Sequence, residues 1–349
     1  MAAKLKVGVL GATGYSGLEL TRLLVRHPRL DRPVFLGRGG EAGNPHANLA
    51  EIFPVLSGNG SYPLEPLSWD SLKRQGVDLL FLATPHEVSR TLVPAAIDQG
   101  LRVIDLSGAW RLKQPEHRST YGFKDQDQAR AAELTEMAVY GLPELNRAKI
   151  PGARILANPG CYATTVILAL APLLRAGLVK TSWGIIADAK SGVSGAGKEP
   201  TPRTHFVSVA DNLSAYGLFT HRHLGEMAEQ LELRRDQITF TPHLLPIPRG
   251  ILSTVYVHLE QPGEAAKLES CYRDFYRGQS FVRVFRPPKL PEIQFSLHTN
   301  YCDLGFCLAA DRERLIIVSC EDNLMKGAAG QAVQNLNLMY GWPEEEGLL

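Results

Sequence analysis

One stretch near the N-terminus limits the possible folds more than any other: an apolar run, a turn with three glycines and a helical pattern follow one another without a break. The run KVGVL leads into GATGYSG, where Gly11, Gly14 and Gly17 are spaced by three residues. The leucines at positions 18, 20, 23 and 24 then recur with helical spacing. A buried strand that turns this sharply into a helix exposes the backbone N–H groups of the helix start, so we expect a phosphate-binding turn.

Such a turn is typical of a Rossmann domain, in which it lies under the pyrophosphate of a dinucleotide. The spacing G-x-x-G-x-x-G departs from the usual G-x-G-x-x-G, so the strand and helix pattern around it carries the prediction. The next short strand, RPVFLG, ends at Arg38, where an enzyme selective for NAD usually has an acidic residue. An arginine there can pair with a 2′-phosphate, which favours NADP.

Three further apolar runs predict parallel strands that end at the same edge of this sheet. VDLLFL is followed by Pro85 and His86, VIDL by Ser107, and ARILA by Asn158. Because cofactor and substrate bind outside the carboxyl ends of parallel strands, we expect these exit loops to line the site. His86 is a candidate for a cofactor contact, although a loop histidine is as often merely exposed.

The last of these runs leads to a cysteine in a turn. Pro159 and Gly160 precede Cys161, and the segment from Tyr162 to Ala176 has the composition of a helix. The thiol therefore lies at or just before a helix start, where the dipole and unpaired N–H groups lower a thiol pKa. The alternative is a small buried residue packed under the turn. Because the preceding strand delivers Cys161 to the cofactor edge, we expect the reactive thiol beside the nicotinamide.

The pattern changes from about Thr181, where strands such as WGIIADAKSG, ITFTPHLLPI and ILSTVYVHL predict a mixed or antiparallel sheet of an α+β domain. A long polar, glycine-rich stretch lies between the first two of these strands, and loops of that length are usually functional or disordered. It contains His221, His223 and Glu226, the last one helical turn after His223. Glu226 can orient His223 or bind a cationic group. The alternative is an ordinary solvated helix start.

Composition narrows the class of partner. A chain of 349 residues is long enough for two domains, and its 37 basic and 36 acidic residues give no charge excess that favours nucleic acid or an anionic membrane. The five cysteines include no C-x-x-C pair, and the His-x-His pair has no soft ligands beside it, so we expect no metal site. The start of the chain shows no leader pattern and no apolar run has membrane length, so we expect a cytoplasmic protein with a small-molecule substrate.

Six motifs in order resemble the N-acetyl-gamma-glutamyl-phosphate reductase family, relatives of aspartate-semialdehyde dehydrogenase. They extend from near the N-terminus to the last helix: GATGYSG, NPGCYATT, KSGVSGAG, HRHLGE, TPHLLPIPRGIL and DNLMKGAAGQAVQNLN. The resemblance implies an α/β fold, with a Rossmann dinucleotide-binding domain and an α+β substrate and dimerisation domain. It also implies NADPH-dependent reduction of N-acetyl-γ-glutamyl phosphate to the semialdehyde through a thioacyl intermediate on Cys161. A homodimer or homotetramer is expected.

The resemblance also assigns site residues. It makes Cys161 the nucleophile and His223 or His221 the acid/base group, without a choice between them. The expected cofactor ligands are Gly11, Thr13, Gly14, Tyr15, Ser16, Gly17, Arg38, Pro85, His86 and Asn323, and the expected substrate ligands are Arg111, Asn158, Lys198, Glu226 and Arg249. Two positions depart from the family pattern: Ala109 replaces an aspartate two residues before Arg111, and Lys198 stands where arginine is frequent.

The predicted boundaries are an NADP-binding domain over 1–157, a catalytic domain over 158–322 and a C-terminal helix over 323–349 that packs back on the first domain. Two alternatives keep the chemistry but change the substrate, to the carrier-bound aminoadipyl phosphate of lysine biosynthesis or to aspartyl phosphate. A third alternative is a dinucleotide-binding regulator without catalysis. The joint presence of Cys161, the two histidines and Asn323 argues against the regulator.

Overall fold

The computed structural model describes residues 4–37, 48–58 and 60–349, so the predicted 2′-phosphate ligand Arg38 lies outside the described residues. The chain divides into two compact units. The first comprises Met1–Lys113, Gly122–Asn158 and Ala329–Leu349, and the second comprises Gln114–Tyr121 and Pro159–Ala328. The second unit therefore takes a short segment, residues 114–121, from within the sequence of the first.

The sheet of the first unit is parallel, with the strand order β3-β2-β1-β4-β5-β7-β6. Its central strands are buried at every residue, as the uninterrupted apolar runs predict for a sheet covered on both faces. The strands are β1 (Val7–Leu10), β2 (Val34–Gly37), β3 (Leu64–Pro66), β4 (Leu79–Leu82), β5 (Arg102–Asp105), β6 (Val139–Tyr140) and β7 (Ile155–Ala157). The predicted Rossmann arrangement is confirmed.

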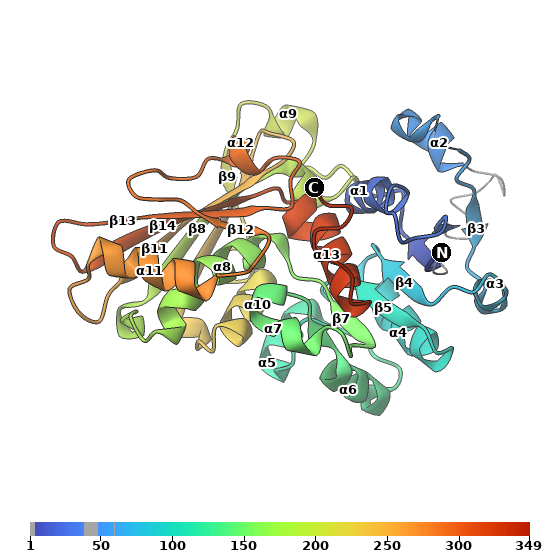
Figure 1. Ribbon diagram of the computed structural model, residues 1–349, viewed down its shortest axis with the longest axis horizontal. Helices are drawn as coiled ribbons and strands as arrows, with labels where there is room; N and C mark the ends of the chain where they lie inside the picture. Colours follow the sequence, from blue (N-terminus) through green and yellow to red (C-terminus); the bar gives the residue numbers. More distant parts are fainter. Residues whose placement is uncertain (1–3, 38–47, 59) are drawn as a thin grey trace. The chain divides into compact units, whose positions relative to one another are not determined.

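Helices connect these strands and supply their apolar cover. Leu72 of α3, Val93 of α4 and Leu134 of α6 join Leu80 and Leu82 of β4 in one buried cluster. The last helix, α13, packs against α1 in this unit (Figure 1). The helices are α1 (Tyr15–Leu24), α2 (Leu49–Ile52), α3 (Trp69–Arg74), α4 (His86–Asp98), α6 (Gln128–Met137), α7 (Pro143–Asn146) and α13 (Gly330–Met339).

The second unit contains a mixed sheet of order β12-β13-β14-β11-β8-β10-β9. The β8–β10 and β12–β13 pairs are parallel and the other pairs are antiparallel, which confirms the predicted α+β sheet. The strands are β8 (Ile185–Gly192), β9 (Ser214–Ala215), β10 (Ile238–Leu245), β11 (Ile251–His258), β12 (Val282–Val284), β13 (Cys302–Leu308) and β14 (Arg314–Glu321). Its helices are α5 (Pro115–Arg118), α8 (Cys161–Arg175), α9 (Phe206–Val209), α10 (His223–Gln230), α11 (Ala265–Phe275) and α12 (Ile293–Ser296).

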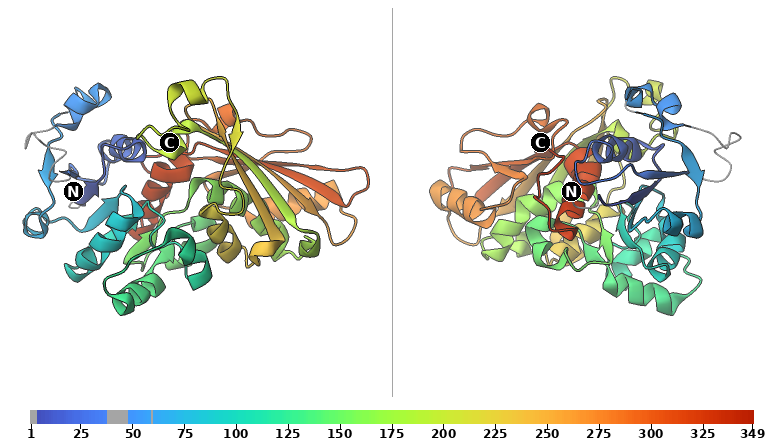
Figure 2. Two further views of the ribbon diagram at one scale, coloured as in Figure 1. Left: turned by 180° about the vertical axis from the view of Figure 1, so that it is seen from behind. Right: turned by 45° about the vertical axis from the view of Figure 1, so that its right-hand side comes forward.

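Helix α8 is the centre of this unit, because it is apolar on all sides and almost wholly buried. It packs on β11 and β14, with α10 and α11 beside it, and Figure 2 shows these helices along one side of the twisted sheet. Pro172 lies inside α8 and has no N–H to donate to the carbonyl of Leu168. The hydroxyl of Tyr276 donates to that carbonyl instead. The helix therefore continues past a proline without an unsatisfied buried carbonyl.

The opposite face of the same sheet carries exposed apolar side chains. Ile186 of β8, Tyr256 of β11 and Ile316 of β14 are 48%, 41% and 39% exposed. Because β8, β11 and β14 are neighbours in the sheet, these residues form one apolar face on the unit. No helix in the described part of the chain is both long and apolar enough to cross a membrane.

Candidate active site

The glycine turn of the first unit has the geometry of a phosphate cradle. Gly11 has φ +92°, and a Cβ there would lie 2.3 Å from the carbonyl oxygen of Ala83. A Cβ on Gly17 would lie 2.0 Å from the carbonyl oxygen of Gly11, so both positions require glycine. Gly14 is the N-cap of α1 and provides no side-chain cap, and the first turn of α1 has no acidic residue. The start of α1, which includes Tyr15 and follows Thr13, therefore fits the phosphates of a dinucleotide.

The other predicted cofactor contacts of this unit lie at the exit of β4. Pro85 is the N-cap of α4 and His86 is its first residue. The Nε2 atom of His86 lies 2.9 Å from Oε1 of Glu87, and its ring makes an edge contact with Phe123. The turn between β4 and His86 thus lies at the same sheet edge as the glycine turn.

Arg111 is held by backbone carbonyls at this edge. Its Nε donates to the carbonyl of Asn158 over 2.7 Å and its Nη2 donates to the carbonyl of Leu106 over 2.8 Å. These contacts support the guanidinium although Ala109 replaces the aspartate of the family pattern. Asn158 is fully buried, and its Oδ1 accepts from Nδ2 of Asn335 on α13. The C-terminal helix therefore contributes to the order of this edge within the first unit.

The second unit presents Cys161 as the first residue of α8, as the sequence predicts. The N-cap Gly160 has φ −75° and ψ 143° and no side chain that could occupy the helix start. Its N–H donates to Oε2 of Glu226 over 2.9 Å. A Cβ on Gly327 would lie 2.7 Å from Cβ of Cys161, so the π-helical segment Met325–Ala329, which follows β14, packs closely against the cysteine. The cysteine lines a pocket of about 370 Å³.

His223 faces the turn that carries the cysteine. A Cβ on Gly160 would lie 2.5 Å from Nε2 of His223 and 2.6 and 2.7 Å from its two ring carbons, so the ring lies against this glycine. Nε2 of His223 is also 3.9 Å from Oε1 of Glu226, whose side chain is fully buried. Glu226 thus touches the N–H before the cysteine and stands beside the histidine. The helical spacing predicts this neighbourhood, and a role for Glu226 in orienting His223 stays a prediction.

His221 occupies a different environment. Its ring makes edge contacts with Tyr162, Tyr216, Phe240 and His223. Burial in this cluster, together with the positive charges of His223 and Arg222, lowers the pKa of His221 to about 2. Its Nδ1 accepts a hydrogen bond from the backbone N–H of His223 over 3.2 Å. His221 is therefore a neutral group that supports the position of His223.

Several lining residues were not anticipated from the sequence. The pocket around Cys161 is also lined by Ser191, Arg203, Tyr216 and Arg222. Arg203 lies over the ring of Tyr216, with 5.6 Å from Cζ to the ring centre. Burial raises the pKa of Tyr216 to about 12, so its hydroxyl stays protonated. Two arginines in a pocket beside a thiol favour an anionic substrate. The sequence predicted that the polar, glycine-rich stretch after β8 is functional, but it did not indicate which of its residues line the pocket.

Four predicted ligands of the second unit lie outside the lining of this pocket, and one of them is the fully buried Glu226. Arg249 forms a bidentate ion pair with the fully buried Asp322, at 3.1 Å and 3.0 Å from Nη2 to the two oxygens. Asn323 uses both ends of its amide, accepting from the N–H of Gly250 and donating to Oγ of Ser194. Lys198 is exposed after the turn at 193–196.

No group of three or more histidine, cysteine, aspartate or glutamate side chains that could hold a metal occurs within residues 4–37, 48–58 and 60–349.

Comparisons with known proteins place both units of the chain in the class of semialdehyde dehydrogenases. The family model for the NAD binding domain of semialdehyde dehydrogenase matches residues 6–153, and the model for the dimerisation domain of semialdehyde dehydrogenase matches residues 161–323. Among solved structures, aspartate semialdehyde dehydrogenase II of Vibrio cholerae is similar in fold, with a TM-score of 0.71 at 18% identity over 97% of this chain and 98% of that one. The enzyme of Candida albicans with NADP has a TM-score of 0.68 at 15% identity, over 97% and 98% of the two chains.

Relatives with higher sequence identity identify the family within this class. A curated protein of Dehalococcoides mccartyi named N-acetyl-gamma-glutamyl-phosphate reductase is 44% identical over 99% of this chain and 97% of its own length. A protein of the same name from Bacillus subtilis is 42% identical over 99% and 98% of the two chains. The chain belongs to the N-acetyl-gamma-glutamyl-phosphate reductase family.

Proposed function

We propose that the chain catalyses the NADPH-dependent reduction of N-acetyl-γ-glutamyl phosphate to N-acetyl-glutamate semialdehyde with release of phosphate, a step of arginine biosynthesis. The observation that carries this proposal is the placement of Cys161 at the start of α8 with the ring of His223 against Gly160. Relatives that match the whole chain carry the name of this activity. We propose further that the first unit binds the cofactor and that the second carries the catalytic groups.

The residues of the first unit fit the cofactor. The backbone of Gly11, Gly14 and Gly17 leaves the start of α1 open to a pyrophosphate, and Arg38 is the proposed ligand of the 2′-phosphate. Pro85 and His86 begin the neighbouring helix α4 and border the same sheet edge. When bound, NADPH supplies a hydride. A fit of this kind is general for dinucleotides, so the choice of NADPH depends on the family.

The first chemical step is acyl transfer to the enzyme. The thiolate of Cys161 attacks the acyl carbon of the substrate, the S–C bond forms, and the C–O bond to phosphate breaks, so that phosphate leaves with the electron pair. The start of α8 stabilises both the thiolate and the oxyanion through the direction of its N–H groups and its dipole. In other acyl-transfer sites one such donor contributes about 3–4 kcal/mol. A cysteine suits this role because its thiolate is both nucleophilic and a good leaving group.

The second step is reduction of the thioester. After hydride reaches the acyl carbon, the resulting oxyanion takes a proton from a neighbouring acid. That proton returns to the same group as the C–S bond breaks, which releases the aldehyde and regenerates the thiolate. We assign the proton transfer to His223, because its ring lies against Gly160 and beside the carboxylate of Glu226. His221 has its pKa lowered to about 2 and cannot serve as a proton donor near neutral pH. It holds the backbone of His223 instead.

Cationic side chains bind the two anionic ends of the substrate. We propose Arg111 for the phosphate end, because it lies at the carboxyl edge of the first sheet. Asn158, predicted as a second ligand, is fully buried, and we propose that it instead positions Arg111 through its backbone carbonyl. Arg203 is the proposed ligand of the substrate carboxylate, because it lines the pocket of Cys161. Lys198 is the proposed cation at the exposed end of the neighbouring turn. Arg249, by contrast, acts through Asp322, which it holds in place beside the predicted cofactor ligand Asn323.

The exposed apolar face of the second sheet supports self-association. Ile186, Tyr256 and Ile316 form this face on neighbouring strands, and the matching family model describes a dimerisation domain. We propose a homodimer or homotetramer that uses this surface. A biosynthetic role with a freely diffusing substrate supports a cytoplasmic location.

A phosphate-dependent oxidation assay tests the proposed function. Purified protein is given NADP⁺, phosphate and one of three aldehydes: N-acetyl-glutamate semialdehyde, the aminoadipate semialdehyde analogue or aspartate semialdehyde. NADPH formation is followed by absorbance. The proposal predicts the highest kcat/KM with the N-acetyl-glutamate compound. A higher kcat/KM with another aldehyde would assign the enzyme to the pathway of that aldehyde. If the protein binds NADPH but oxidises none of the three aldehydes, the non-catalytic regulator is the remaining interpretation.

A further inference from the structure

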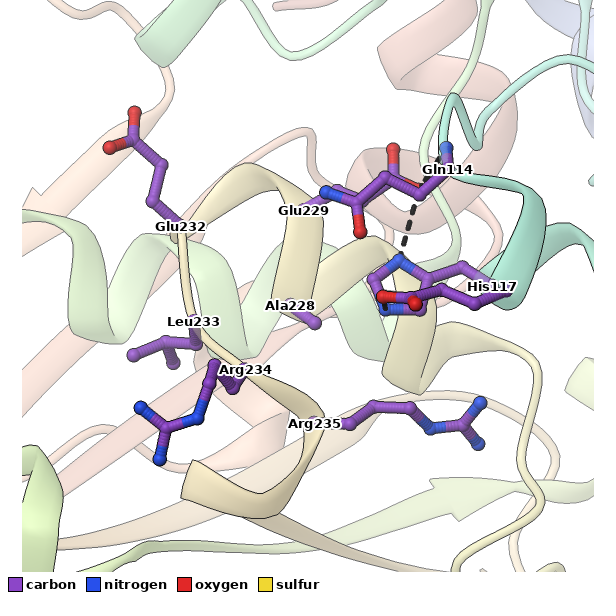
Figure 3. Close-up of a pocket in the computed structure, with 9 residues that line it drawn as sticks. Gln114, His117, Ala228, Glu229, Glu232, Leu233, Arg234 and Arg235 are labelled. Atoms are coloured by element: carbon purple, nitrogen blue, oxygen red, sulfur yellow. Dashed lines mark hydrogen bonds and ion pairs between the residues drawn. The ribbon is translucent and has the colours of Figure 1, made fainter.

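A buried pair of side chains anchors the far end of the helix that carries His223. Oε1 of Glu229 accepts hydrogen bonds from the backbone N–H of Gln114 over 2.9 Å and from Nδ1 of His117 over 3.0 Å. The side chains of His117 and Glu229 are only 3% and 4% exposed. Figure 3 shows Gln114, His117 and Glu229 together at one wall of a surface pocket. A carboxylate buried with two donors is a fixed contact rather than a loose surface ion pair.

The segment that makes this contact also touches the other end of α10. Residues 114–121 belong to the second unit although the sequence on both sides belongs to the first. At the end of this segment, the guanidinium of Arg222, which is the N-cap of α10, lies over the ring of Tyr121 at 5.5 Å. The segment therefore holds α10 at Arg222 before its first residue and at Glu229 near its last.

The spacing along α10 links this anchor to the catalytic groups. His223, Glu226 and Glu229 are separated by three residues each and share one side of the helix. Glu226 receives the N–H of Gly160, and His223 lies against that glycine. From His223 to Glu229 the helix rises by about 9 Å. A shift or rotation of the Glu229 end therefore moves the imidazole relative to the cysteine turn.

We propose that the His117–Glu229 pair is a positioning element for catalysis, which sets the placement of His223 by fixing α10 to the segment 114–121. The inference rests on the proposed function of His223 as the proton donor. Neither residue contacts the pocket of Cys161, so both act through the helix. A misplacement of about 1 Å can lower a rate by roughly 100-fold, and we expect the loss of the anchor to act on this scale.

The first test uses variants of Glu229. Glu229→Ala removes both acceptor contacts, and we expect kcat to fall by about 10- to 100-fold. KM for NADP⁺ should stay within about twofold, because the cofactor residues lie on other elements. Glu229→Gln keeps an oxygen that can accept from Gln114 and should recover most of kcat. The matched control is Glu116→Gln: Glu116 is 76% exposed and its oxygen lies 3.7 Å from Nε2 of His117, so its loss should leave kcat unchanged.

The pocket beside the pair permits a second test. It has a volume of about 420 Å³ and is lined by His117 and Glu229, so a ring removed by His117→Ala leaves a space that is open to solvent. Added imidazole can enter that space and donate to Glu229. We expect imidazole to raise kcat of His117→Ala severalfold while it leaves the wild-type protein and Glu229→Ala unchanged, because the latter has lost the acceptor.

Alkylation of Cys161 separates this inference from the proposed function. If no aldehyde is oxidised by the wild-type protein, the proposed function fails, but the rate of iodoacetamide alkylation at Cys161 still reports on the histidine beside it. The inference predicts that Glu229→Ala, shown by circular dichroism to be fully folded, has a changed rate and pH profile of alkylation. Glu229→Gln should recover the wild-type rate and profile. Wild-type alkylation and wild-type kcat in folded Glu229→Ala would overturn it, as would equal stimulation of both Ala variants by imidazole.

Discussion

Replacement of Gly160 by alanine is a sharp test of the proposed catalytic geometry. The backbone at Gly160, with φ −75° and ψ 143°, is open to any residue, so alanine adds a methyl group without backbone strain. The new Cβ would lie 2.5 to 2.7 Å from three atoms of the His223 ring, whereas ordinary contacts begin near 3.4 Å. The ring must therefore withdraw by roughly 1 Å, and a displacement of this size costs about 100-fold in rate.

The assay for Gly160→Ala is steady-state oxidation of N-acetyl-glutamate semialdehyde with phosphate and NADP⁺. We expect kcat to fall by about 100-fold while NADPH binding, measured by fluorescence, is unchanged. The matched control is Gly152→Ala, because a Cβ at Gly152 meets no atom within 4 Å. This control should keep wild-type kcat. If Gly160→Ala also keeps kcat within twofold, His223 is not the proton donor and the reasoning is refuted.

Three further predictions concern substrate binding and stability. Arg203→Ala should raise KM for the aldehyde by about tenfold or more, from the loss of a charged hydrogen bond, and leave NADPH binding intact; an unchanged KM removes Arg203 as a ligand. The pKa of His221, lowered from 6.5 to about 2, makes the unfolded chain take up the proton first as pH falls. The neutral His221 therefore makes its full contribution to the free energy of unfolding above pH 6.5. As the pH falls from 6.5 toward 2, that contribution decreases by up to about 1.4 kcal/mol per pH unit. Urea unfolding at pH 7 and pH 5 should show a smaller pH effect in His221→Gln, and an equal effect contradicts the assignment. Tyr276→Phe should lower the free energy of unfolding by about 1–3 kcal/mol, because the carbonyl of Leu168 above Pro172 loses its donor; a change below about 0.5 kcal/mol contradicts this role.

The features that the sequence predicts well depend on neighbouring residues. The turn with Gly11 and Gly17 follows from local chain geometry, and the structure shows close approaches that only glycine permits. The position of Cys161 follows from the Pro-Gly step before it and the apolar helix after it. The strands of both sheets follow from their apolar runs. The mixed sheet was predictable in kind, because its strands lack the alternation with long helices that a parallel sheet requires.

The features that the sequence could not give depend on long-range pairing. Basic residues such as Arg249 are indistinguishable in sequence from a substrate ligand, and only the fold brings this one to the buried Asp322. The preference between His221 and His223 depends on the aromatic cluster around His221, which comes from three separate segments. Membership of residues 114–121 in the second unit depends likewise on Glu229, more than a hundred residues away.

The most direct test of the covalent mechanism is a single-turnover experiment without phosphate. N-acetyl-glutamate semialdehyde and NADP⁺ are mixed with a known amount of enzyme, NADPH is followed by absorbance, and the protein is then digested for mass spectrometry. The account predicts a burst of one NADPH per active site that stops until phosphate is added, with one acetylglutamyl group on Cys161, and no burst in Cys161→Ser. Continuous NADPH formation without phosphate, or an acyl group on another residue, would contradict it.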